Sequence, residues 1–100
     1  MALLLNVDDN DAIRYARTRL LQDAGFRVVE ASRGREALGA VDLYSPAVVL
    51  LDVHLPDVNG VEICRQIKAN PQTAFIQVIN ISGTALAEPV QASALHAGAD

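Results

Sequence analysis

The chain has 100 residues, of which 51% are hydrophobic and 20% charged, and its formal net charge is −4. This length fits one domain with a hydrophobic core, and the acidic balance argues against a module that binds nucleic acid directly. The longest apolar stretches are far shorter than the ~20 residues of a membrane span. The single cysteine, Cys64, and the absence of a signal-peptide pattern fit a reducing setting. We therefore expect one cytoplasmic domain over residues 1–100, without membrane contact.

Four short apolar runs along the chain predict β-strands. In order they are Leu3–Val7, Arg27–Ala31, Ala47–Val53 and Ile76–Ile81. The third run is apolar at every position before Asp52, which is typical of a strand buried on both faces of a sheet.

Between these runs, apolar residues recur at helical spacing. The first predicted helix is marked by Ile13, Ala16, Leu20, Leu21 and Ala24. Asn10 or Asp11 would cap its start, and Gly25 would end it.

Three further helices are predicted along the chain. The second follows Gly34 and is broken by Pro46, and the third begins at Val61 and ends at Asn70–Pro71. The fourth spans roughly Leu86 to Ala97. Strands that alternate with helices in this way predict an α/β domain with a parallel sheet and helices on both faces. In such sheets, ligands bind beyond the carboxyl ends of the strands.

Acidic and hydroxyl side chains follow three of the predicted strands. Asp8 and Asp9 end the first strand, Asp52 ends the third, and Ser82 ends the fourth. Helix capping explains Asn10 and Asp11 better than it explains Asp52, because no helix is predicted until about eight residues after Asp52. Carboxylates that meet at one sheet edge repel one another unless a cation lies among them.

Magnesium is the cation that fits this set, because it takes oxygen ligands and retains waters that a phosphate can replace. No EF-hand spacing supports calcium, and no ligand spacing among Cys64, His54 and His96 supports zinc. A metal, a carboxylate and a small hydroxyl together suit phosphoryl transfer, in which the carboxylate would be the nucleophile.

Four segments together resemble the CheY-like receiver domain of two-component response regulators. They are VDDN at 7–10, LLDVHLPDVNG at 50–60, VINISG at 78–83 and ALHAGAD at 94–100. The resemblance runs in the right order over the whole chain. It implies a flavodoxin-like sheet of strand order 2-1-3-4, with the fifth strand and helix of the family absent from this chain.

The resemblance assigns roles to single residues. It implies that Asp52 accepts a phosphoryl group from the phosphohistidine of a sensor kinase or phosphotransfer protein, with Mg²⁺ as cofactor. Asp9 and Asp52 would bind the metal directly, Asp8 through water, and His54 through its main-chain carbonyl. Ser82 would be the switch hydroxyl that contacts the phosphoryl group, and the small Gly83 after it would leave the site open.

The sequence departs from the family pattern in two places. The lysine–proline pair of the fifth strand is not present in this chain, and Asn6 stands where a central strand of the family has an aliphatic residue. A buried amide needs hydrogen-bond partners, and the sequence does not identify them.

Two other functions are compatible with parts of the pattern. A pseudo-receiver would be an interaction module that takes no phosphoryl group. The missing lysine favours this alternative, whereas the intact Asp8, Asp9, Asp52 and Ser82 argue against it. A magnesium-dependent phosphohydrolase would need a second acid two residues after its nucleophile, where this chain has His54. The helix segments at 14–17 and 63–68 are similar to receivers of hybrid histidine kinases, so the parent protein could be such an enzyme.

A sheet without a fifth strand would leave the fourth strand at its edge. This strand is apolar and carries neither proline nor charge, so its free backbone groups could pair with another chain. We expect self-association through this strand or through the sheet face that a fifth helix would cover.

Overall fold

The computed structural model of the chain describes residues 2–52 and 55–81. The predictions for His54, Ser82, Gly83 and the helix at 86–97 lie outside these residues.

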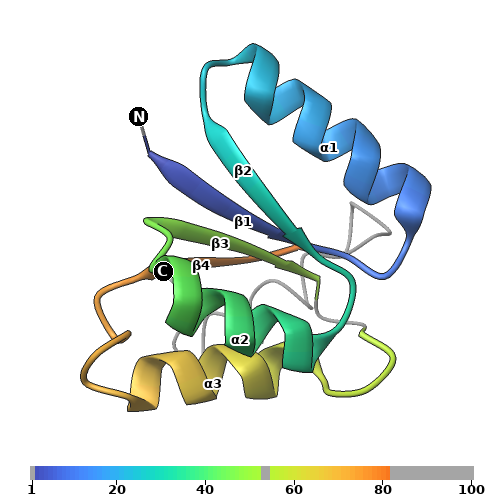
Figure 1. Ribbon diagram of the computed structural model, residues 1–100. Coiled ribbons are helices and arrows are strands. Elements are labelled where there is room, and N and C mark those ends of the chain that lie inside the picture. Colours follow the sequence, from blue (N-terminus) through green and yellow to red (C-terminus); the bar gives the residue numbers. More distant parts are fainter. Residues whose placement is uncertain (1, 53–54, 82–100) are drawn as a thin grey trace.

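The described residues form an α/β domain with one parallel sheet. The elements are β1 (Leu3–Val7), α1 (Asp11–Asp23), β2 (Arg27–Ala31), α2 (Gly34–Tyr44), β3 (Val48–Asp52), α3 (Gly60–Ala69) and β4 (Gln77–Ile81). The strand order β2-β1-β3-β4 confirms the predicted order, and all three strand pairs are parallel. Helix α1 covers one face of the sheet, and α2 and α3 cover the other (Figure 1). Within the described part of the chain, no helix has the length and apolar character needed to cross a membrane.

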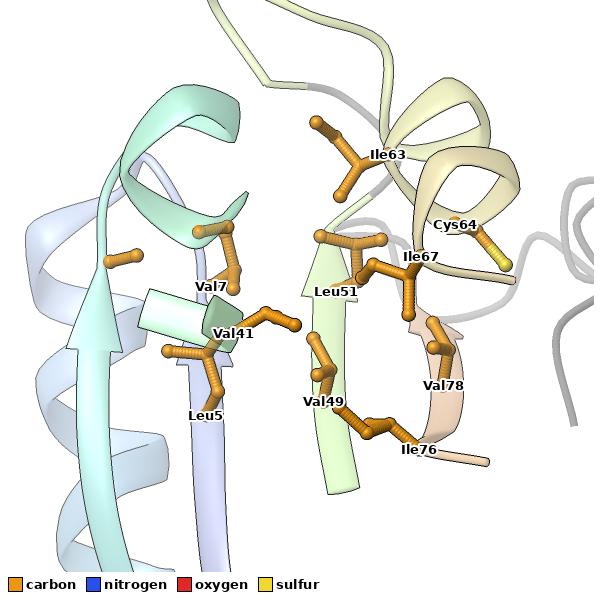
Figure 2. Close-up of a cluster of buried hydrophobic side chains, with 12 residues drawn as sticks. Leu5, Val7, Val41, Val49, Leu51, Ile63, Cys64, Ile67, Ile76 and Val78 are labelled. Atoms are coloured by element: carbon orange, nitrogen blue, oxygen red, sulfur yellow. The ribbon is translucent and has the colours of Figure 1, made fainter. Parts of the chain in front are cut away.

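The hydrophobic core lies between the sheet and helices α2 and α3 (Figure 2). Alternate residues of the strands supply one side of it, and α2 and α3 supply the other. Its fully buried members include Leu5, Val7, Val49, Leu51, Ile63 and Val78. Cys64 is also fully buried here, which fits a packing role for the thiol.

The opposite face of the sheet is less apolar than the sequence predicts. Of the residues of α1, all of which are described, only Thr18 is buried. Leu20 is 70% exposed and Ile13 is 37% exposed. The helix is turned so that Arg14, Arg17 and Thr18 approach β1, where each of them makes a hydrogen bond with Asn6.

The expected burial of the third strand on both faces is only partly correct. Val49 and Leu51 are fully buried toward α2 and α3, whereas Val48 and Leu50 on the α1 face are partly exposed. Strand β4 lies at the edge of the sheet formed by the described residues. Self-association through it stays a prediction.

The predicted helix boundaries follow local chemistry. Asn10 caps α1 by accepting a hydrogen bond from the N–H of Ile13, and Gly25 follows the helix with a φ of 100°. Asn59 caps α3 in the same way, and Asn70 is extended before Pro71.

Helix α2 has no cap of its own, since the side chain of Arg33 makes no capping hydrogen bond. Its cap is Asp57, from the loop that precedes α3. The Asp57 carboxylate accepts hydrogen bonds from the N–H groups of Gly34 (2.8 Å) and Arg35 (3.1 Å). These hydrogen bonds lower the pKa of Asp57. Asp57 therefore ties the loop before α3 to the start of α2.

The close approach of this loop predicts a cost for a side chain at Gly34. A Cβ atom there would lie 3.0 Å from Ile63 Cδ1 and 3.1 Å from Val58 Cβ. We expect Gly34→Ala to lower the free energy of unfolding by about 1–3 kcal/mol, as overpacking does in cores. Gly39 lies in the same helix with nothing within 4 Å of a Cβ. Gly39→Ala should stabilise the domain by about 0.5–1 kcal/mol through helix propensity. Urea unfolding of both variants measures the contrast, and equal effects would contradict it.

The Asp57 cap predicts a pH-dependent contribution to stability. A carboxyl whose pKa is lowered by folding stabilises the fold above its unfolded pKa of about 3.9, and this contribution is lost as the pH falls through the lower folded value. Asp57→Asn should therefore be less stable than the parent at pH 7, and the difference should shrink below about pH 4. Thermal unfolding across this range tests the prediction. The matched control is Asp42→Asn, which removes an exposed carboxylate from the same helix.

Candidate functional site

Three carboxylates meet at the carboxyl edge of the sheet. Strands β1 and β3 are parallel neighbours, and Val7 is paired with Leu51 in their register. The next residues along the two strands, Asp8 and Asp52, therefore reach the same edge together. Asp9 follows in the loop. One carboxylate oxygen from each of the three lies within 4.8 Å of the others.

The three aspartates differ in their exposure. Asp8 is 1% exposed and Asp52 is 4% exposed, whereas Asp9 is exposed to solvent. Two buried carboxylates and one open carboxylate form a site that is anchored in the sheet and accessible from one side.

Asp8 is held by contacts with helix α1 and the loop before it. Its Oδ1 atom accepts a hydrogen bond from the N–H of Asn10 at 2.9 Å, and its main-chain carbonyl accepts one from Arg14 Nη1 at 2.7 Å. Arg17 Nη2 lies 3.3 Å from Asp8 Oδ2 as an ion-pair partner. Among the described residues, the buried Oδ2 atom has no hydrogen-bond partner. A hydrogen bond with Asp11 raises the pKa of the Arg14 guanidinium.

The site fits a divalent cation by the chemistry of its donors. All three side chains offer hard carboxylate oxygens, which are the ligands that Mg²⁺ prefers. A buried oxygen without a hydrogen bond is costly in the fold, and a cation or its bound water would satisfy it. Asp8, Asp9 and Asp52 are therefore the residues that would hold the metal.

The structure brings together three of the predicted site residues and leaves the others undecided. Asp8, Asp9 and Asp52 converge as expected from their positions after the strands. His54, Ser82 and Gly83 lie outside the described residues, so their roles stay predictions.

The structure also supplies the missing partners of Asn6. The fully buried amide donates hydrogen bonds to Thr18 Oγ1 and to the carbonyl of Arg14, both at 3.0 Å. Its Oδ1 atom accepts one from Arg17 Nη1 at 3.0 Å. Sequence reasoning missed Arg17 and Thr18 as neighbours of the site. One signal in the sequence could have indicated these contacts. An amide lies in a central strand, and an arginine and a threonine lie between the apolar positions of the first helix, so the three polar side chains could satisfy one another.

Comparison with known proteins agrees with this geometry. Residues 4–100 match the family model described as the response regulator receiver domain. Response regulator MprA of Mycolicibacterium vanbaalenii is 37% identical over 97 residues, which are 97% of this chain and 41% of MprA. Protein PilH of Pseudomonas aeruginosa is 33% identical over 82% of this chain and 68% of its own length. The chain thus spans about two fifths of one curated relative and two thirds of another.

A solved structure shows the same fold. The chemotaxis response regulator CheY4 of Vibrio cholerae has a TM-score of 0.89 and 31% sequence identity, over 99% of this chain and 82% of that chain. The order of the parallel strands, the acidic edge of the sheet and the family match all indicate the same family. The chain belongs to the response regulator receiver domain family of two-component signalling.

Proposed function

We propose that the chain accepts a phosphoryl group on Asp52, with Mg²⁺ held by Asp8, Asp9 and Asp52. The observation that carries the proposal is the convergence of three carboxylate oxygens within 4.8 Å at the carboxyl edge of the sheet. Membership of the receiver family supports the assignment of Asp52 as acceptor, because Asp52 ends the central strand β3 and stands at the start of the DVHLPDVNG segment.

The reaction needs a nucleophile and a donor. A carboxylate oxygen of Asp52 would attack the phosphorus of a phosphohistidine on a sensor kinase or phosphotransfer protein. The new O–P bond makes an acyl phosphate, and the P–N bond breaks with its electron pair returning to the imidazole. When bound, Mg²⁺ supplies positive charge that offsets the charge of the transferring group.

The chain's own residues have separate tasks in this reaction. Burial of Asp52 at the end of β3 fixes the direction of its carboxylate, since the strand is paired on both sides. Asp9 is open to solvent and therefore faces the side from which a donor would arrive. We further propose that Ser82 contacts the transferred phosphoryl group, that Gly83 keeps the site open, and that the carbonyl of His54 contributes to the metal site.

The loop after the acceptor is fixed from outside the site. Asp57 lies five residues after Asp52 and binds the start of α2 through two main-chain N–H groups. This contact would hold Asp57 beside the start of α2 while a phosphorylated partner docks.

The proposal is tested with acetyl phosphate as donor and intact mass as readout. The parent protein should gain one phosphoryl group in the presence of Mg²⁺ and none after chelation. Asp52→Asn should gain none, because a neutral amide is a poor nucleophile. Asp9→Ala should slow phosphoryl incorporation about tenfold or more. The variant would bind Mg²⁺ more weakly, so less positive charge would stabilise the transition state.

A matched control is Asp23→Asn, which removes an exposed carboxylate at the far end of α1 and should react like the parent. Labelling of Asp52→Asn at the parent rate would refute Asp52 as the acceptor. A metal-replete parent that takes no phosphoryl group from acetyl phosphate or from a phosphohistidine donor would instead favour the pseudo-receiver alternative.

A further inference from the structure

Arg17 occupies a position that the proposed reaction does not use. It projects from α1 toward the acidic edge, and its guanidinium contacts two groups with separate nitrogens. Nη1 donates to Asn6 Oδ1 at 3.0 Å, and Nη2 lies 3.3 Å from Asp8 Oδ2. The side chain of Arg17 is 20% exposed and that of Asp8 is 2% exposed. The ion pair is therefore shielded from solvent, where charge interactions are screened less than at the surface.

Asn6 is what holds the guanidinium in this place. Its amide is fully buried and has every group engaged, with Nδ2 bound to the helix at Thr18 and Arg14, and Oδ1 bound to Arg17. The Thr18 hydroxyl in turn donates to Glu30 of β2. An aliphatic residue in place of Asn6 could not accept a hydrogen bond from Arg17. The network therefore fixes a positive charge beside a carboxylate of the proposed metal site.

Each carboxylate oxygen of Asp8 has a polar neighbour without a metal, although the ion pair at Oδ2 is not a hydrogen bond. Oδ1 accepts from the N–H of Asn10, and Oδ2 faces Arg17. A cation that binds at the acidic edge must therefore share the negative charge of Asp8 with the guanidinium. From this geometry we propose that Arg17 is a positioning residue that lowers the affinity of the acidic site for divalent cations. The inference rests on the proposed function, because it takes the aspartate cluster to be a metal site.

Loss of the guanidinium has two opposing effects, and the structure indicates which is larger. Removal of a positive charge favours the cation, whereas a less ordered Asp8 disfavours it. Asp8 remains anchored without Arg17, because its Oδ1 is bound to Asn10 and its N–H donates to the carbonyl of Ala31 at 3.1 Å. The effect of the lost positive charge should therefore be the larger one, and the affinity for the cation should rise. Thermodynamic reciprocity adds that a bound cation must weaken the contact between Arg17 and Asp8 to the same extent.

The first test is a calorimetric titration of the intact protein with MgCl₂ alone, without a phosphodonor. We expect Arg17→Gln to bind Mg²⁺ about three- to tenfold more tightly than the parent, as expected for loss of a nearby positive charge in a partly shielded site. Glutamine removes the positive charge and keeps a polar side chain at this position. Arg17→Lys loses the two-pronged contact but keeps a positive charge on this side of Asp8, so its Mg²⁺ affinity should stay within about twofold of the parent.

Arg19→Gln is the matched control, since it removes the same charge from the same helix. Arg19 is exposed and donates to the Tyr15 hydroxyl on the outer side of α1. Its replacement should change the Mg²⁺ affinity less than about twofold at physiological salt. Affinity that is unchanged or weaker in Arg17→Gln, or equally tight in Arg17→Lys and Arg17→Gln, would overturn the inference.

A second measurement uses the parent protein and does not depend on the folding of any variant. The side-chain Nε–Hε resonance of Arg17 is followed by NMR during the same MgCl₂ titration. The Arg17 signal should shift at the same midpoint Mg²⁺ concentration as the amide signals of Asp8 and Asp9, while the Arg19 signal should not shift. An Arg17 signal that does not change while the Asp8 and Asp9 amide signals shift would refute the coupling between Arg17 and the metal site. A parent that binds no Mg²⁺ in either experiment would refute the proposed function itself, which separates the two failures.

Discussion

The parallel pairing of β1 with β3 is the constraint on which the site depends. It places Asp8 and Asp52 at the same edge of the sheet, although 43 intervening residues separate them in the sequence. Like charges at this distance repel, so the fold must offset the cost by packing elsewhere or by bound cations. The core between the sheet and helices α2 and α3 provides that packing, because twelve buried residues of the described part of the chain form one continuous cluster there.

The two faces of the sheet perform different tasks. The face under α2 and α3 is apolar and forms the core. On this side of the sheet, Asp57 also binds the start of α2. The face under α1 carries a polar network that runs from Glu30 through Thr18 and Asn6 to Arg17 and Asp8. A buried network of this kind is stable only when each member has a partner, so it specifies one orientation of α1 on the sheet.

This division links stability to chemistry. The residues that orient α1 are the same residues that set the charge around Asp8. A change at Asn6 or Arg17 would therefore act both on the packing of the helix and on the electrostatics of the acidic edge.

Local signals in the sequence were sufficient for the elements and for the acidic edge. Alternating apolar runs and helical spacing predicted the seven described elements, with ends set by Asn10, Gly25 and Pro71, because these residues act on the backbone next to them. The position of Asp8, Asp9 and Asp52 after their strands predicted their meeting, because parallel strands present their carboxyl ends at one edge. The family resemblance then supplied the strand order, which periodicity does not contain.

Tertiary structure alone decided which side chains meet across elements. The sequence marked Ile13 and Leu20 as members of the apolar face of α1, yet both are exposed, because the helix is turned toward Asn6 by Arg17 and Thr18. Asp57 caps a helix that begins 23 residues earlier, and no local pattern around it indicates this contact. Such contacts depend on the packing angle of a helix and the path of a loop, which are set by the whole assembled sheet and leave no periodic signal along the chain.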